Sequence, residues 1–138
     1  MRIAVIDGQG GGIGRTVIAR LRAEFGNRVH IIALGTNSQA TANMLKSGAD
    51  SGATGENAVS VTSHKVELII GPLAILMANS MMGEITPRMA ENVADSSARK
   101  IIIPMNLCNV HMVGSQDLKM AEAMVQVSDE VERLLRKA

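Results

Sequence analysis

The chain has 138 residues and a formal net charge of +1, from 14 Lys and Arg against 13 Asp and Glu. This length fits one compact domain and leaves little room for a second. The chain carries no basic run and no aromatic platform, so we expect no nucleic-acid partner. It contains no Trp and no Tyr, which excludes tyrosine from any catalytic role.

The stretch before Asp7 is too short and too close to an acid to act as a signal peptide. The longest apolar stretch, residues 68–82, is interrupted by Gly, Pro, Asn and Ser, and it falls short of the ~20 apolar residues of a membrane span. The single cysteine, Cys108, cannot form an internal disulfide, in agreement with a reducing compartment. We therefore predict a cytoplasmic protein that has no contact with a membrane.

Short β-branched runs alternate along the chain with longer amphipathic segments, which is typical of an α/β domain. We predict a single three-layer Rossmann-like domain over residues 1–138, with a mainly parallel sheet of about five strands. The predicted strands are residues 2–6, 29–34, 66–70, 100–103 and 110–113. The predicted helices are residues 13–25, 38–47, 56–64, 72–82, 87–95 and 117–137.

Three of these segments carry more detailed predictions. Residues 48–55 contain three glycines together with Asp, Ser and Thr, so they are predicted as a loop. Residues 56–64 fit a short helix or an edge strand, and we favour the helix because the chain must return to the other edge of the sheet. In the last helix five residues share the predicted buried side: Leu118, Ala121, Val125, Val131 and Leu135.

Five glycines follow the first predicted strand and open the next helix: Gly8, Gly10, Gly11, Gly12 and Gly14. Several backbone N–H groups can converge there with no Cβ in the way, and the helix N-terminus adds partial positive charge. The pattern predicts a phosphate-binding turn, in which Asp7 and Ile13 also take part. The alternative is a tight strand-to-helix crossover that needs small residues only for packing.

The turn does not fit the dinucleotide pattern G-x-G-x-x-G, because Ile13 stands where the third glycine would be. Gly8, Gly12 and Gly14 match G-x-x-x-G-x-G, and over about the first 35 residues the sequence resembles the cofactor loop of short-chain dehydrogenases. This resemblance implies NAD, NADP or another nucleotide as a ligand. The activity of that family relies on a tyrosine, which this chain lacks, so the activity is not carried over.

Four segments carry a second resemblance, which covers almost the whole chain: IDGQGGGIG at 6–14, ALGTN at 33–37, GATGENA at 52–58 and ANSMMGEITP at 78–87. Together they resemble a bacterial family of short Rossmann-like proteins known only as a domain of unknown function. The resemblance implies the fold and brings no activity with it.

Further candidate ligand contacts lie beyond the ends of other predicted strands, where parallel sheets bind ligands. Thr36 and Asn37 follow the second strand and could hydrogen-bond a sugar, although helix capping explains Asn37 equally well. Thr54, Glu56 and Asn57 form either a ligand clamp or a capping box. The second strand ends without a carboxylate for a ribose 2′-OH and without an Arg for a 2′-phosphate.

The candidates for catalysis are few. Glu84 is the best candidate for a general base, Asp7 is either a brace of the loop or a contact to a ligand or metal, and Cys108 is a weak candidate nucleophile. Cys108 and His111 would point to opposite faces of a strand, so we predict no metal site. The ten methionines indicate an adaptable core or a subunit contact, and the length is compatible with a homodimer.

Three functions therefore remain open. The first is a binding protein that holds a nucleotide or another phosphate-bearing ligand on residues 8–14, with Thr36, Asn37 and residues 50–57 contacting the remainder. The second is a small enzyme that acts on a phosphorylated or carboxylated metabolite. The third is an oligomeric scaffold with a purely structural glycine loop.

Overall fold

The computed structural model describes residues 1–105, 109–115 and 117–138. Within these ranges, parallel strands form a five-stranded sheet in the order β3-β2-β1-β4-β5. The strands are β1 (Arg2–Asp7), β2 (His30–Gly35), β3 (Ser51–Thr54), β4 (Leu68–Pro72) and β5 (Arg99–Ile103). The helices are α1 (Gly12–Phe25), α2 (Ser38–Lys46), α3 (Glu56–Thr62), α4 (Pro87–Asp95) and α5 (Met120–Lys137), with two short 3-10 helices, η1 (Gly26–Arg28) and η2 (Leu73–Leu76).

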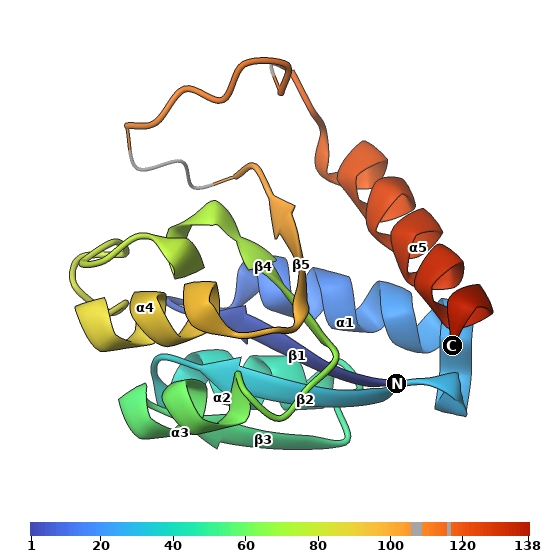
Figure 1. The fold of residues 1–138 in the computed structure, drawn as a ribbon, viewed down its shortest axis with the longest axis horizontal. Coiled ribbons are helices and arrows are strands. Elements are labelled where there is room, and N and C mark those ends of the chain that lie inside the picture. Colours follow the sequence, from blue (N-terminus) through green and yellow to red (C-terminus); the bar gives the residue numbers. More distant parts are fainter. Residues whose placement is uncertain (106–108, 116) are drawn as a thin grey trace.

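Helices cover both faces of the sheet, so the fold has three layers (Figure 1). α1, α2 and α5 pack on the face that receives Ile3 and Val5 of β1, and α3, α4 and η2 pack on the face that receives Ala4 and Ile6. All four β1 side chains are fully buried, because a central parallel strand is apolar on both sides. The predicted class, a three-layer Rossmann-like α/β fold with a mainly parallel sheet, is confirmed.

The direction in which the chain adds strands changes at β1. β2 and β3 extend the sheet on one side of β1, and β4 and β5 extend it on the other. Crossovers that leave neighbouring strands in opposite directions open a crevice at the carboxyl end of the sheet, and open α/β sheets bind their ligands there. The border between β1 and β4 is therefore the position at which a site is expected.

The prediction of a loop over residues 48–55 is wrong. Ser51–Thr54 form the edge strand β3, which pairs in parallel with β2. A Cβ at Gly52 would lie 3.0 Å from Thr41 and 3.1 Å from Leu45, both on α2. The small residues that suggested a loop thus let α2 pack closely over the edge of the sheet.

The prediction of a strand over residues 110–113 is also wrong. These residues lie outside the sheet, and Val113 is 91% exposed. A β-branched run becomes a strand only where a neighbouring strand accepts its hydrogen bonds and a buried face receives its side chains. The edge position next to β2 is filled by β3, so the expected number of strands is right although one member differs.

The sequence predicts a helix over residues 72–82 after β4, and this prediction is wrong beyond η2. The Ser80 hydroxyl donates to the Ala74 carbonyl at 2.6 Å, and the Asn79 amide donates to the Ile85 carbonyl at 2.7 Å. These bonds compete with the helical pattern and fold residues 77–86 into a compact loop. Within it Asn79, Met81 and Met82 adopt positive φ angles of 66°, 55° and 56°.

The last helix begins at Met120 rather than at residue 117. Its buried side is formed by Ala123, Met124, Val127, Ser128 and Val131. Ala121 and Val125 are exposed, contrary to the prediction, while Leu118 and Leu135 are partly buried against the core. The helix carries apolar residues on more than one side. Which side is buried depends on how the helix packs on α1 and β5.

The remaining helices occur where they were predicted, including α3 over residues 56–62. The Asn37 side chain caps α2 by accepting from the Ala40 amide at 2.9 Å, and the Thr86 hydroxyl caps α4 by accepting from the Met89 amide at 3.2 Å. Among the described residues, no helix is long and apolar enough to cross a membrane.

The cap of α4 gives a first prediction. Thr86→Ala removes the acceptor for the Met89 amide and should lower the free energy of unfolding by about 1 kcal/mol. Thr86→Ser keeps a hydroxyl at the same position and should retain most of the stability. Urea unfolding of both variants measures the difference, and equal losses in the two would show that the cap does not stabilise the helix.

Candidate functional site

The candidate site is the turn from β1 into α1. β1 ends at Asp7, and residues 8–11 lead directly into α1. The Gly11 amide donates to the Gly8 carbonyl at 2.9 Å, and Gly11 adopts a φ of 71°. The chain therefore turns tightly at the carboxyl end of the central strand, in the crevice beside β4.

The carboxylate of Asp7 braces the turn from inside. Its side chain is buried, its Oδ1 accepts from the Gly8 amide at 2.8 Å, and its Oδ2 accepts from the Gly14 amide at 2.7 Å. Burial raises the pKa of Asp7 above its ordinary value, and the hydrogen bonds from Gly14 and Gly8 offset only part of this effect. Of the two interpretations of Asp7, the structure shows the brace; contact with a ligand stays a prediction.

The carboxylate of Glu84 holds the turn from outside. Its Oε1 accepts from the Gln9 amide at 2.8 Å, from the Thr36 hydroxyl at 2.6 Å and from the Asn37 side-chain amide at 2.8 Å. Burial alone would raise the pKa of Glu84, but these three hydrogen bonds together hold the pKa below its ordinary value. A carboxylate with a lowered pKa is a poor general base, so the geometry favours a bracing role.

The carbonyl groups of the turn are held by asparagines of α2 and its cap. The Asn37 side-chain amide donates to the Gln9 carbonyl at 2.9 Å, and the Asn43 side-chain amide donates to the Gly10 carbonyl at 2.8 Å. Asn37 thus caps α2 and fixes the turn at the same time. Sequence reasoning missed Asn43, because only the packing of α2 beside α1 brings this half-buried helix position to the glycines.

The structure separates the five glycines into two groups. Gly8, Gly11 and Gly14 are needed for the fold. A Cβ would lie 2.5 Å from Thr36 Oγ1 at Gly8 and 2.5 Å from Met44 Sδ at Gly14, and Gly11 has a left-handed φ. Gly10 and Gly12 differ: a Cβ at either position meets nothing within 4 Å, and neither residue has a positive φ.

The same two residues carry the free amides of the turn. Among the residues that the structure describes, the amides of Gly10 and Gly12 have no hydrogen-bond partner, whereas those of Gly8, Gln9, Gly11 and Gly14 do. Gly10 and Gly12 are also exposed, while the three structural glycines are buried.

A cavity of about 400 Å³ opens in front of these amides. It is lined by Asp7, Gly8, Gln9, Gly10, Gly12, Ile13, Met105 and Met120. Its volume falls within the range of small-molecule sites, roughly 300–1,000 Å³. Met105 follows β5 and Met120 begins α5, so no local sequence pattern indicates that these two methionines lie beside the glycines.

Several predicted site residues are not brought to this cavity. Thr36 and Asn37 contact the turn from the β2 side and do not line the cavity. The Thr54 hydroxyl pairs with the Thr41 hydroxyl at 2.7 Å. Asn37 is held in the cluster with Glu84. A direct contact between Asn37 and a sugar therefore has no geometric support and stays a prediction.

The predicted capping box at residues 54–57 does not form. The N-cap of α3 is Gly55, which offers no side chain, and Glu56 and Asn57 face Arg88 of α4 at 3.6 Å and 3.5 Å instead. The alternative, a ligand clamp over the glycine turn, stays a prediction. Cys108 lies outside the described residues, and within them no group of three His, Cys, Asp or Glu side chains could hold a metal ion.

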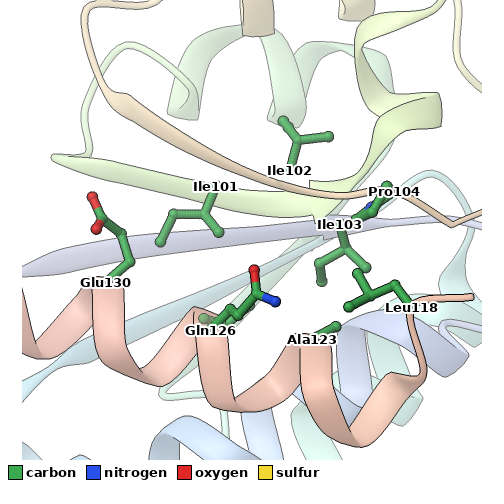
Figure 2. Close-up of a pocket in the computed structure, with 9 residues that line it drawn as sticks. Ile101, Ile102, Ile103, Pro104, Leu118, Ala123, Gln126 and Glu130 are labelled. Atoms are coloured by element: carbon green, nitrogen blue, oxygen red, sulfur yellow. The ribbon is translucent and has the colours of Figure 1, made fainter. Parts of the chain in front are cut away.

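A second cavity, of about 260 Å³, lies between β5 and α5. Figure 2 shows Ile101 and Ile103 pointing from β5 toward α5, while Ile102 points away from it. Gln126 and Glu130 contribute the polar groups of this cavity, and the Glu130 carboxylate is already paired with Arg133. Polar and apolar groups thus line this cavity together, and its carboxylate is already in an ion pair.

The parallel sheet, its strand order and the glycine turn define a Rossmann-like α/β protein. Residues 2–136 match the family described as "Domain of unknown function (DUF3842)", and the chain belongs to this family. The second resemblance noted in the sequence is thereby confirmed. No curated protein matches the chain in sequence.

Two solved structures share parts of the fold. A universal stress protein from Archaeoglobus fulgidus is 15% identical, covers 75% of this chain and 98% of its own, and has a TM-score of 0.44. A dodecameric FMN-dependent UbiX-like decarboxylase from Escherichia coli O157:H7 is 16% identical, covers 94% of this chain and 75% of its own, and has a TM-score of 0.48.

The two groups of glycines give a matched pair of predictions. Gly11→Ala should lower the free energy of unfolding by about 1–2 kcal/mol, because alanine is strained at a left-handed φ and its Cβ would lie 3.0 Å from the Ala40 carbonyl. Gly12→Ala should be neutral or stabilise by up to about 1 kcal/mol, because its Cβ enters open space. Urea unfolding measures both, and a large loss in Gly12→Ala would contradict the division.

The hydrogen bonds of Glu84 predict a pH dependence. A folded-state pKa below the unfolded value means that the ionised group stabilises the fold at neutral pH, and that this contribution disappears as the pH falls through the lowered pKa. Glu84→Gln should therefore lower the free energy of unfolding by about 1–2 kcal/mol at pH 7 and by progressively less in acid.

The control for this experiment is Glu91→Gln, which alters an exposed acid on α4. Urea unfolding between pH 3 and 7 compares the two variants. A deficit of Glu84→Gln that does not depend on pH would assign the loss to packing rather than to the carboxylate.

Proposed function

We propose that the protein binds a nucleotide or another phosphate-bearing ligand on the turn formed by residues 8–14. The observation that carries this proposal is that, in the described part of the chain, Gly10 and Gly12 have free backbone amides at positions where the fold does not need glycine. Neither packing nor backbone conformation requires glycine there, and both amides lack a partner among the described residues. Small side chains at these positions keep the space in front of two N–H donors open.

The electrostatics of the turn favour an anion. Gly12 is the first residue of α1, a helix of 14 residues whose dipole places partial positive charge at this end. The first turn of α1 contains no acidic residue. A phosphate oxygen in the cavity would supply acceptors for the two free amides, which is how helix N-termini bind phosphate.

The two carboxylates near the turn do not compete for these donors. Asp7 accepts from Gly8 and Gly14, and Glu84 accepts from Gln9. Because the pKa of Asp7 is raised, its carboxylate takes up a proton more readily. Protonation of Asp7 would lower its repulsion of an anion bound beside it.

A purely structural loop explains three glycines and leaves two unexplained, so the scaffold alternative has less support. Among the described residues, the small-enzyme alternative has no candidate base in the cavity other than Asp7. Catalysis, a homodimer and a cytoplasmic location stay predictions.

Thermal unfolding with added ligands tests the proposal. A ligand that binds only the folded chain stabilises it by about 2.7 kcal/mol at 100 times its Kd. We expect a phosphate-bearing ligand among inorganic phosphate, NAD, NADP and ATP to raise the Tm of the wild-type chain. Gly12→Asp should fold normally, because an acid suits a helix N-terminus, and should lose this shift through charge repulsion.

Two controls separate size from charge and position. Gly12→Ala adds a Cβ without charge and should keep most of the shift, and Asn27→Asp places the same charge beyond the other end of α1 and should keep all of it. A full shift in Gly12→Asp would show that the ligand does not bind at the turn.

A further inference from the structure

The turn has two sides, and the side toward β2 is already occupied. At Gly8, a Cβ would lie 2.5 Å from Thr36 Oγ1, 2.6 Å from Met81 Sδ and 3.0 Å from Glu84 Oε1. Thr36 follows β2, whereas Met81 and Glu84 come from the loop of residues 77–86. Side chains from two segments therefore pack directly against the backbone of the turn.

This packing involves the groups that a dinucleotide would need. In dinucleotide-binding domains a carboxylate at the end of the second strand binds the ribose hydroxyl. Here the polar groups at that position, Thr36 and Asn37, donate to Glu84 at 2.6 Å and 2.8 Å. Asn37 also donates to the Gln9 carbonyl and accepts from the Ala40 amide. A nucleoside that bound Thr36 and Asn37 would therefore have to replace their hydrogen bonds to the Glu84 carboxylate.

The opposite side of the turn is open. The 400 Å³ cavity extends from the glycines toward the end of β5 and the start of α5, where Met105 and Met120 line it. Ile13 adds a third apolar side chain. Methionine side chains are flexible and polarisable, and they adapt well to flat apolar or aromatic groups.

We infer that the ligand is a compact phosphomonoester with an apolar body. This inference rests on the proposed function. The phosphate of this ligand accepts from the amides of Gly10 and Gly12, and its apolar body lies against Ile13, Met105 and Met120. Glu84 acts as a positioning residue: it holds the loop of residues 77–86 over the β2 side of the turn. The loop thereby keeps the nucleoside of a dinucleotide away from that side. The site therefore selects against NAD and NADP.

Isothermal titration of the full chain with three probes tests this inference: inorganic phosphate, 1-naphthyl phosphate and NAD. We expect 1-naphthyl phosphate to bind about tenfold more tightly than inorganic phosphate, because its ring buries apolar surface on the methionines. NAD should bind no more tightly than inorganic phosphate.

Variants locate the apolar contact. Met105→Gln and Met120→Gln keep the size of the side chain and add a polar group, so they should remove the preference for 1-naphthyl phosphate over inorganic phosphate. The control is Met82→Gln, whose side chain is 97% exposed on the loop of residues 77–86 and does not line the cavity. This control should behave as the wild type.

The outcomes distinguish the two proposals. Equal affinities for all three probes, tighter binding of NAD, or a preference that survives in both methionine variants would overturn the inference and leave phosphate binding at the turn intact. If none of the probes bound, the proposed function would fail and the inference with it.

Discussion

The turn from β1 into α1 keeps its shape because two carboxylates hold its backbone amides from opposite sides. Asp7 accepts from Gly8 and Gly14 inside the fold, and Glu84 accepts from Gln9 outside it. Backbone donors held by charged acceptors are among the stronger hydrogen bonds in proteins. Among the described residues, this bracing leaves the amides of Gly10 and Gly12 without a hydrogen-bond partner, and both glycines line the cavity.

Glu84 also links segments that are distant in the chain. One carboxylate oxygen joins the glycine turn, the end of β2 and the cap of α2 to the loop of residues 77–86. That loop contains non-glycine residues with positive φ, including Met81 and Met82. Backbone strain of this kind persists where surrounding contacts impose it, often beside functional sites. The strained loop and the turn thus form one structural unit at the carboxyl end of the sheet.

The elements that could be predicted are those in which local sequence and tertiary environment agree. β1, β2 and β4 read as apolar runs because both faces of a parallel sheet are buried. β3 could not be predicted, because a glycine-rich edge strand depends on its pairing with β2, and residues 110–113 carry strand-forming side chains without a partner strand. In the site, the glycine turn and the bracing of Asp7 could be predicted. The role of Glu84 could not, since its three partners lie 47, 48 and 75 residues away along the chain.

The sequence by itself determined that this is a parallel α/β protein with a glycine-rich turn after its first strand, because hydrophobic periodicity and glycine spacing are local properties. Only the tertiary structure decided which glycines serve the fold and which face open space. It also decided that the open side of the turn is lined by Met105 and Met120 and not by Thr36 and Asn37. The physical reason is that steric clearance and hydrogen-bond satisfaction depend on side chains brought in from distant segments, and no pattern within the turn encodes their positions.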